Sequence, residues 1–212
     1  MTLGPVTSSD VNYAGKNPDD VRVTNLDNET ASITVSALCG NNTEMGGTAT
    51  FTVVLGSQPT SDVSIAVSSS DTSEATISPS SLTFGSSNYS TLQTVTVTGV
   101  DDFYDDDNVS YTITVDPSRS ITSYNTMTSS TVTGYNIDND TAAITVGAKS
   151  GNTSEFGTTA TINVTLATIP TANVRIVVTA NDNTEVSITP TTLTITQIYL
   201  EYHQSGHTHS SG

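Results

Sequence analysis

The sequence contains no tryptophan and a single cysteine, Cys39, and its lysines and arginines together number five. One cysteine excludes an intrachain disulfide, which fits a scaffold stabilised by sheet packing and by metal rather than by cross-links. The scarcity of basic residues excludes nucleic acid as a partner, because no surface can neutralise phosphates, and it argues equally against docking on anionic lipid. An aromatic fraction of 6% leaves few rings to line a sugar-binding cleft.

Long apolar runs are also missing. No segment stays apolar for the roughly eighteen residues that a membrane-spanning helix needs, so we expect no direct membrane insertion. The first ten residues lack both a basic and an apolar region, so a secretion signal, if the parent protein has one, is expected upstream. The formal net charge of −16 instead suits an extracellular or cell-surface protein surrounded by divalent cations.

What the chain has in abundance is threonine and valine in strict alternation. Between residues 48 and 55, Ala49, Phe51, Val53 and Leu55 fall on one side and threonines on the other, the pattern of a half-buried strand. No window shows a sustained helical period. The alternation and the intervening turn residues predict strands at Ala31–Ala37, Thr48–Leu55, Val63–Ser69, Glu74–Ile77 (a short edge strand), Ser81–Phe84, Thr94–Thr98, Ser110–Val115 and Thr131–Tyr135.

An internal repeat organises these strands. The segment Asn25–Val35 returns 111 residues later as Asn136–Val146, and the same spacing relates Glu44 to Glu155 and Asp71 to Asp182. A period of this length is too long for a solenoid turn and matches an immunoglobulin-like sandwich. We therefore predict an all-β fold of tandem immunoglobulin-like antiparallel β-sandwich repeats.

The repeat sets the expected domain boundaries. Residues 1–28 match the end of the first repeat, with Tyr13 aligned to Tyr124 and Val21 to Val132, and are expected to form the closing strand of a preceding repeat. Residues 29–140 form a complete sandwich, 141–196 the first half of a second repeat, and 197–212 an aberrant tail that holds all three histidines, His203, His207 and His209. Three explanations remain open for the half repeat: a fragment, a reading-frame slip, or missing strands supplied by another chain.

The most distinctive stretch lies between the predicted strands Thr94–Thr98 and Ser110–Val115. Five aspartates, Asp101, Asp102, Asp105, Asp106 and Asp107, fall within seven residues. With reference pKa values near 4 they are charged at pH 7 and repel one another, and a hard cation such as Ca²⁺, which takes six to eight oxygen ligands, relieves that repulsion. The competing interpretation is a solvated acidic loop on an acidic protein.

Further carboxylates stand in other loops of the same repeat. Glu44 precedes one predicted strand, Asp71 follows another, and Asp138 and Asp140 follow the last strand at the junction to the second repeat. If the strands alternate in direction, these loops converge at one pole of the sandwich. The junction residues would then be ligands themselves and would fix the linker.

The layout resembles the Calx-beta family, the calcium-binding sandwich of sodium–calcium exchangers that recurs in bacterial surface proteins and adhesins. The matching segments are Glu44–Gly47, the acidic loop Val100–Asp107 and the closing Asn136–Asp140. The resemblance implies that Ca²⁺ is bound by Glu44, Asp71, Asp101, Asp102, Asp105, Asp106, Asp138 and Asp140. Asn139 departs from the family's acidic closing triplet. In the second repeat only Glu155 and Asp182 persist, so no intact second site is expected.

These features predict a non-enzymatic, calcium-binding structural repeat of an extracellular bacterial surface, adhesin or stalk protein. No Ser/His/Asp grouping is expected, because every histidine lies in the tail. The sequence also has no glycine-rich phosphate-binding loop. Its expected partners are neighbouring repeats or other copies of the chain, and the sequence does not identify an adhesin ligand. Two alternatives remain: a filament subunit assembled by β-strand exchange between chains, and a calcium-sensor domain of an exchanger-like membrane protein.

Overall fold

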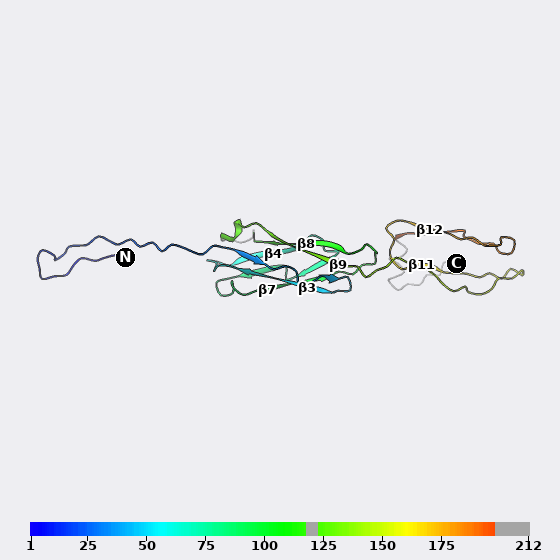
Figure 1. The fold of residues 1–212 in the computed structure, drawn as a ribbon, viewed down its shortest axis with the longest axis horizontal. Coiled ribbons are helices and arrows are strands. Elements are labelled where there is room, and N and C mark those ends of the chain that lie inside the picture. The colour runs from blue at the N-terminus through cyan, green and yellow to red at the C-terminus, as the bar shows by residue number, and fades with distance from the viewer. Residues whose placement is uncertain (118–122, 198–212) are drawn as a thin grey trace.

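The computed structural model describes residues 1–117 and 123–197, which are extended along one axis (Figure 1). An N-terminal hairpin leads into a two-sheet sandwich, and two short two-stranded sheets follow it. Within the described residues, no helix has the length and apolar character needed to cross a membrane. The predictions for the tail beyond Gln197, including the three histidines, lie outside the described residues.

Two sheets form the sandwich, and they confirm the predicted all-β, mainly antiparallel character. The first sheet has the order β1 (Ile33–Val35), β3 (Thr48–Leu55), β7 (Gln93–Gly99) and β5 (Ala75–Ser78). The second has the order β2 (Asn42–Thr43), β9 (Ser130–Ile137), β8 (Val109–Asp116), β4 (Val63–Ser69) and β6 (Ser81–Phe84). Among the described strands, only β2 and β9 pair in parallel, and a 3-10 helix, Ser123–Thr126, precedes β9.

The core lies between the two sheets and follows the alternation of the sequence. On β3, Phe51 and Val53 are buried while Thr50 and Thr52 point outward. β-Branched and aromatic side chains suit this pleated, half-buried surface. The second sheet contributes Ile65, Ile113 and Tyr111, each at most 1% exposed, to the same cluster. Alternation alone therefore determines which residues of these strands form the core.

The observed strand bounds follow the predicted ones closely, with one strand missed. β3, β4 and β6 coincide with the predicted ranges, and β5 is an edge strand as expected. β1 is shorter than predicted. β2 was not predicted, because it is only two residues long and exists through its parallel pairing with the end of β9, to which no local pattern points.

After the sandwich, β10 (Ile144–Val146) pairs with β11 (Val164–Leu166), and β12 (Val174–Val177) pairs with β13 (Thr192–Ile195). Their registers repeat those of the sandwich at the 111-residue spacing. Ile144 pairs with Leu166 as Ile33 pairs with Leu55. In the same way, β12 and β13 repeat the pairing of β4 with β6.

The N-terminal segment forms a loose hairpin that extends away from the sandwich (Figure 1). Its two arms are joined by backbone hydrogen bonds from Val6 N to Lys16 O (2.7 Å) and from Val21 N to Met1 O (3.1 Å). Its apolar side chains remain in solvent, with Val23 78% and Leu26 82% exposed. The hairpin therefore has hydrogen-bonded arms without a core of its own.

Candidate metal centre

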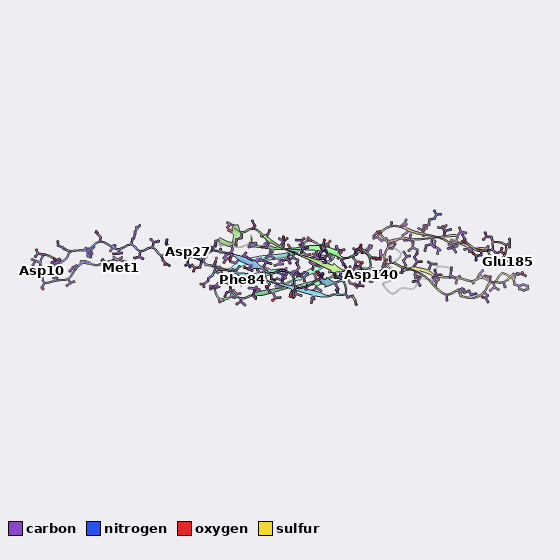
Figure 2. All side chains as sticks on the ribbon, in the orientation of Figure 1. Met1, Asp10, Asp27, Phe84, Asp140 and Glu185 are labelled. Carbon is purple, nitrogen blue, oxygen red and sulfur yellow. The ribbon has the colours of Figure 1, made fainter. Side chains whose placement is uncertain are left out.

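Four segments that are distant in sequence bring carboxylates to one end of the sandwich, which we call the acidic pole. Glu44 follows β2, and Glu74 immediately precedes β5. The acidic loop 101–107 follows β7, and Asp138 and Asp140 follow β9. Figure 2 shows Asp140 where the sandwich meets the β10–β13 segment.

The carboxylates of the acidic pole form two groups of three. In the first, Glu44, Asp138 and Asp140 each offer an oxygen within 4.8 Å of the other two. In the second, Glu74, Asp102 and Asp106 meet the same condition. The groups adjoin, because Asp102 and Asp106 lie close enough to Glu44 to raise its pKa. Such an all-oxygen, all-anionic set suits a hard divalent cation.

Glu44 is held in place by a tight turn and by the strand beside it. Gly46 has a φ of 77°, which glycine adopts without steric cost, and its N–H donates to the Glu44 carbonyl at 2.6 Å. The Glu44 N–H donates to the Ile137 carbonyl at 3.2 Å, and the Glu44 carboxylate accepts from the Asn139 N–H at 3.2 Å. A side chain that is only 1% exposed therefore has its carboxylate facing the end of β9.

Glu74 is positioned from inside the sandwich. Its carboxylate accepts a hydrogen bond from the Asn136 side-chain amide at 3.2 Å, and the same amide nitrogen donates to the Val100 carbonyl at 2.9 Å. The Glu74 carbonyl accepts from the Val100 N–H at 3.0 Å. Glu74 and the beginning of the acidic loop are therefore anchored to the same residue of β9.

The acidic loop is shaped by hydrogen bonds from its own backbone and from the segment after β9. Asp102 accepts from the Tyr104 N–H at 2.8 Å. Asp107, which has a positive φ of 64°, directs its N–H to Asp138 at 3.0 Å, and Asp138 also accepts from the Asp140 N–H at 2.6 Å. These contacts link the two carboxylate groups through the backbone rather than through side-chain charges of opposite sign.

Burial and the charges of neighbouring acids raise the pKa of two carboxylates in each group. Burial is the main cause for Glu44, whose pKa rises from 4.5 to about 7; the Asn139 hydrogen bond opposes this, and the charges of Asp102, Asp138 and Asp106 add to it. Burial, followed by neighbouring carboxylates, likewise raises the pKa of Asp106 and Asp140. Burial also raises the pKa of Glu74, and the hydrogen bond from Asn136 opposes this increase. Every charged neighbour named here is another acid.

Among the described residues from Glu44 to Asp140, no lysine or arginine is present to neutralise the acidic pole. The sequence has no lysine or arginine between Arg22 and Arg119, nor between Arg119 and Lys149, so the residues 23–118 and 120–148 contain none. Buried charges are ordinarily paired with opposite charges or with metals. The acidic pole therefore has the donor chemistry of a cation site and lacks the basic residues of a salt-bridge network.

Three of the residues that the family resemblance implied as ligands are not in either group. Asp71 instead accepts from the side chain and the N–H of Ser73, which lowers its pKa and caps the turn before β5. Asp101 accepts from the Asn139 side-chain amide at 3.1 Å, and Asp105 accepts from the Ala142 N–H at 2.7 Å. Asp101 and Asp105 therefore attach the acidic loop to residues 139–142, at the junction between β9 and β10.

Glu74 was absent from the predicted ligands because it occupied the start of a predicted strand. A signal was available, since Glu74 recurs as Glu185 at the repeat spacing and such an acid is unusual beside a buried strand. Asn136, an amide inside an alternating strand, carried a similar signal. In the β10–β13 segment, Asp182 caps Thr184 as Asp71 caps Ser73, and no group of three potential metal ligands occurs among its described residues.

Comparison with known proteins leaves the family open. No protein-family model matches the chain, and no curated protein matches it. Among solved structures, the chain is similar to WR4, a member of the MSP family of C. elegans, at 14% identity and a TM-score of 0.34, covering 49% of this chain and 96% of that one.

Proposed function

We propose that this chain is a calcium-binding structural segment of an extracellular or cell-surface protein, built from tandem Calx-beta-like sandwich repeats. The observation that carries the proposal is the convergence of six carboxylates in two adjoining groups at the acidic pole, without a lysine or arginine among the described residues 44–140 to balance them. The identical registers of β1·β3 and β10·β11, and of β4·β6 and β12·β13, support the repeat.

Glu44, Asp138 and Asp140 would hold one cation, and Glu74, Asp102 and Asp106 a second. Ca²⁺ is favoured over Mg²⁺ because carboxylates on four separate segments provide flexible oxygen ligands, whereas Mg²⁺ demands near-ideal octahedral geometry. A bound cation supplies the positive charge that the acidic pole lacks. The chain's own residues position the carboxylates, with Asn136 and the turn at Gly46 setting two of them.

We expect cation binding to stabilise the folded sandwich and to stiffen its junction with the next segment, because the cation binds only the folded state. A cation that binds the folded pole and not the unfolded chain stabilises the fold by about 2.7 kcal/mol at a hundredfold excess over its dissociation constant. The ligands Asp138 and Asp140 lie between β9 and β10, so the cation would also fix the junction. This role fits a stalk or adhesive repeat, which must resist extension outside the cell.

The test is thermal unfolding of the chain in excess Ca²⁺ and in chelator, beside the double variant Asp102→Asn, Asp106→Asn. We expect Ca²⁺ to raise the melting temperature of the unmodified chain by on the order of 10 °C and the double variant to lose the share of that rise that the second cation contributes. Asp19→Asn with Asp62→Asn makes the same charge change at exposed positions outside the pole and should retain the rise. Identical melts of the unmodified chain with and without Ca²⁺ would show that the acidic pole is only a solvated charge cluster.

A further inference from the structure

The segment between β9 and β10 supplies hydrogen-bond donors to the acidic pole. It runs from Asp138 to Ala142. The Asn139 N–H donates to the Glu44 carboxylate at 3.2 Å, and the Ala142 N–H donates to Asp105 at 2.7 Å. Such donors favour the ionised form of a carboxylate. The segment therefore offsets part of the repulsion between the acids with N–H groups instead of basic side chains.

Asn139 contacts acids on two other segments. Its backbone N–H bonds Glu44, which follows β2, and its side-chain amide donates to the Asp101 carboxylate at 3.1 Å, at the start of the acidic loop. The orientation of the amide follows from its partner, because an ionised carboxylate only accepts hydrogen bonds and so must face the amide nitrogen. One residue therefore links the acidic loop, the turn after β2 and the end of β9.

Asp101 has this amide as a partner although it lies outside both groups of three carboxylates. It is nevertheless close to the first group. Burial is the main cause of the raised pKa of Asp140, and the charges of Asp138 and Asp101 add to it. Asp101 therefore needs a positive partner as the other acids of the pole do, and the partial positive charge of the Asn139 amide is in that position.

An asparagine recurs between two acids at the repeat spacing. Asn139 is flanked by an aspartate on each side, and Asn28, 111 residues earlier, is flanked by Asp27 and Glu29. The acid that follows the asparagine differs between the two copies, whereas the asparagine does not. An aspartate would have nearly the same size and shape, so the property that both copies retain is the amide donor.

We propose that Asn139 is a positioning residue that takes the place of a further cation at the acidic pole. Its amide nitrogen holds Asp101, and its backbone N–H holds Glu44, before any cation binds. This inference rests on the proposed cation site and deepens it, because it limits the pole to one cation for each of the two groups. The acidic loop stays attached to the end of β9 without using the carboxylates of either group for that purpose.

Three variants separate the hydrogen bond from the charge. Asn139→Asp keeps the size of the side chain but turns a second carboxylate toward Asp101. Asp101→Asn combined with Asn139→Asp exchanges donor and acceptor, so the bond re-forms with no change in net charge. Asn108→Asp is the matched control, because it adds the same charge at the pole while its oxygen still accepts from the Asp138 N–H, as the Asn108 oxygen does at 3.1 Å.

Thermal unfolding in chelator tests the positioning role without a cation. We expect Asn139→Asp to lower the melting temperature by a few degrees, because a hydrogen bond to a charged group is replaced by repulsion between two carboxylates. The exchange variant should recover most of that loss, and Asn108→Asp should lose much less. Equal losses in Asn139→Asp and Asn108→Asp, or no recovery in the exchange variant, overturn the positioning role.

Calorimetric titration with Ca²⁺ counts the cations. We expect two for the unmodified chain, one for each group of carboxylates. Asn139→Asp should bind one more, because its new carboxylate joins Asp101 and Asp105, which belong to neither group. The exchange variant and Asn108→Asp should both return the count of the unmodified chain. If Asn139→Asp binds no additional Ca²⁺, Asn139 does not take the place of a cation, and the proposal is overturned.

The two measurements distinguish failure of this inference from failure of the proposed function. An unmodified chain that binds no Ca²⁺ contradicts the proposed function and the cation count together, and the melts in chelator then decide by themselves whether Asn139 positions Asp101. An unmodified chain that binds Ca²⁺ with the same count as Asn139→Asp retains the proposed function and overturns only the inference.

Discussion

The Asn136 side chain donates hydrogen bonds both to the Glu74 carboxylate, at 3.2 Å, and to the Val100 carbonyl, at 2.9 Å. Asn136 lies on β9, whereas Glu74 and Val100 flank β5 and β7 of the opposite sheet. Behind it lies the buried Asn42 amide, whose oxygen accepts from the Tyr111 hydroxyl and whose nitrogen donates to the Asn136 side-chain oxygen at 3.4 Å. A polar network therefore runs from the core to the acidic pole.

Replacing Asn136 by serine is expected to weaken cation binding by the group that contains Glu74 by roughly tenfold. The serine hydroxyl is too short to reach both Glu74 and Val100, so one carboxylate loses its fixed orientation; losses of 10- to 100-fold are typical when such supporting contacts are removed. Calorimetric titration with Ca²⁺ measures the change. Val132→Ala, a core truncation on the same strand, should lower stability in chelator without lowering the affinity, and equal affinity losses in both variants would mean that Asn136 acts only through stability.

Stability in chelator is expected to fall as the pH rises from 4.5 to about 7. The pKa of Glu44 is raised over that interval, chiefly by burial, so the contribution of its protonated form is present below the lower value and is lost as pH passes the higher one. The raised pKa values of Glu74, Asp106 and Asp140 act in the same direction. The pKa of Asp71 is lowered from 3.8, so the stability that its ionised form contributes is lost only at more acidic pH. Denaturant unfolding at a series of pH values measures the slope.

The variant Glu44→Gln isolates the largest contribution to that slope. It cannot ionise, so its stability in chelator should vary less between pH 4.5 and 7 and should exceed that of the unmodified chain at neutral pH. It should also gain less from Ca²⁺, because one ligand is lost. If Glu44→Gln left the pH dependence of stability unchanged, Glu44 would not be the main source of that dependence.

Gly99 is expected to tolerate no side chain. A Cβ at this position would overlap the Thr43 carbonyl and the Asn136 side chain, so Gly99→Ala must displace either β2 backbone or the network that supports Glu74. Overpacking of this kind typically costs about 1–3 kcal/mol, which thermal unfolding in chelator would register as a drop of several degrees. Gly151→Ala, with no atom within 4 Å of the added Cβ, should have little effect. Equal melting of the two variants would contradict the close approach.

Most strands of the sandwich could be predicted because the alternating pattern that indicates each of them lies within the strand itself. Alternation placed β3, β4 and β6 at their observed bounds, since each strand buries one face and exposes the other. β2 lacks such a signal, because its two residues become a strand only by pairing with Asn136 and Ile137, far along the chain.

The acidic pole was predictable in composition but not in detail. The dense Asp cluster and the repeated acids indicated Glu44, Asp102, Asp106, Asp138 and Asp140 as candidates, and these lie in the two groups. Sequence spacing could not show that the Asp71 side chain turns to Ser73, nor that Glu74 is drawn into the pole by an amide from the opposite sheet. The second outcome depends on hydrogen bonding between segments far apart in the sequence, whereas the first is a local contact two residues along the chain, which the Asp/Ser spacing allows without requiring it.

The acidic loop also contacts the β10–β13 segment, so cation binding should slow exchange of specific amide protons at the junction. The Ile169 N–H donates to the Phe103 carbonyl at 2.8 Å, and the Ala142 N–H donates to Asp105 at 2.7 Å. A loop whose carboxylates are neutralised opens less often, and exchange requires opening. Hydrogen exchange followed by NMR should show both amides protected at least fivefold more in Ca²⁺ than in chelator. The Ala167 N–H, which donates to the Ala143 carbonyl and not to the loop, is the internal control. Equal protection factors for Ile169 and Ala142 in the two conditions would mean that the acidic pole and the junction are uncoupled, and that Ca²⁺, if bound, stiffens only the sandwich.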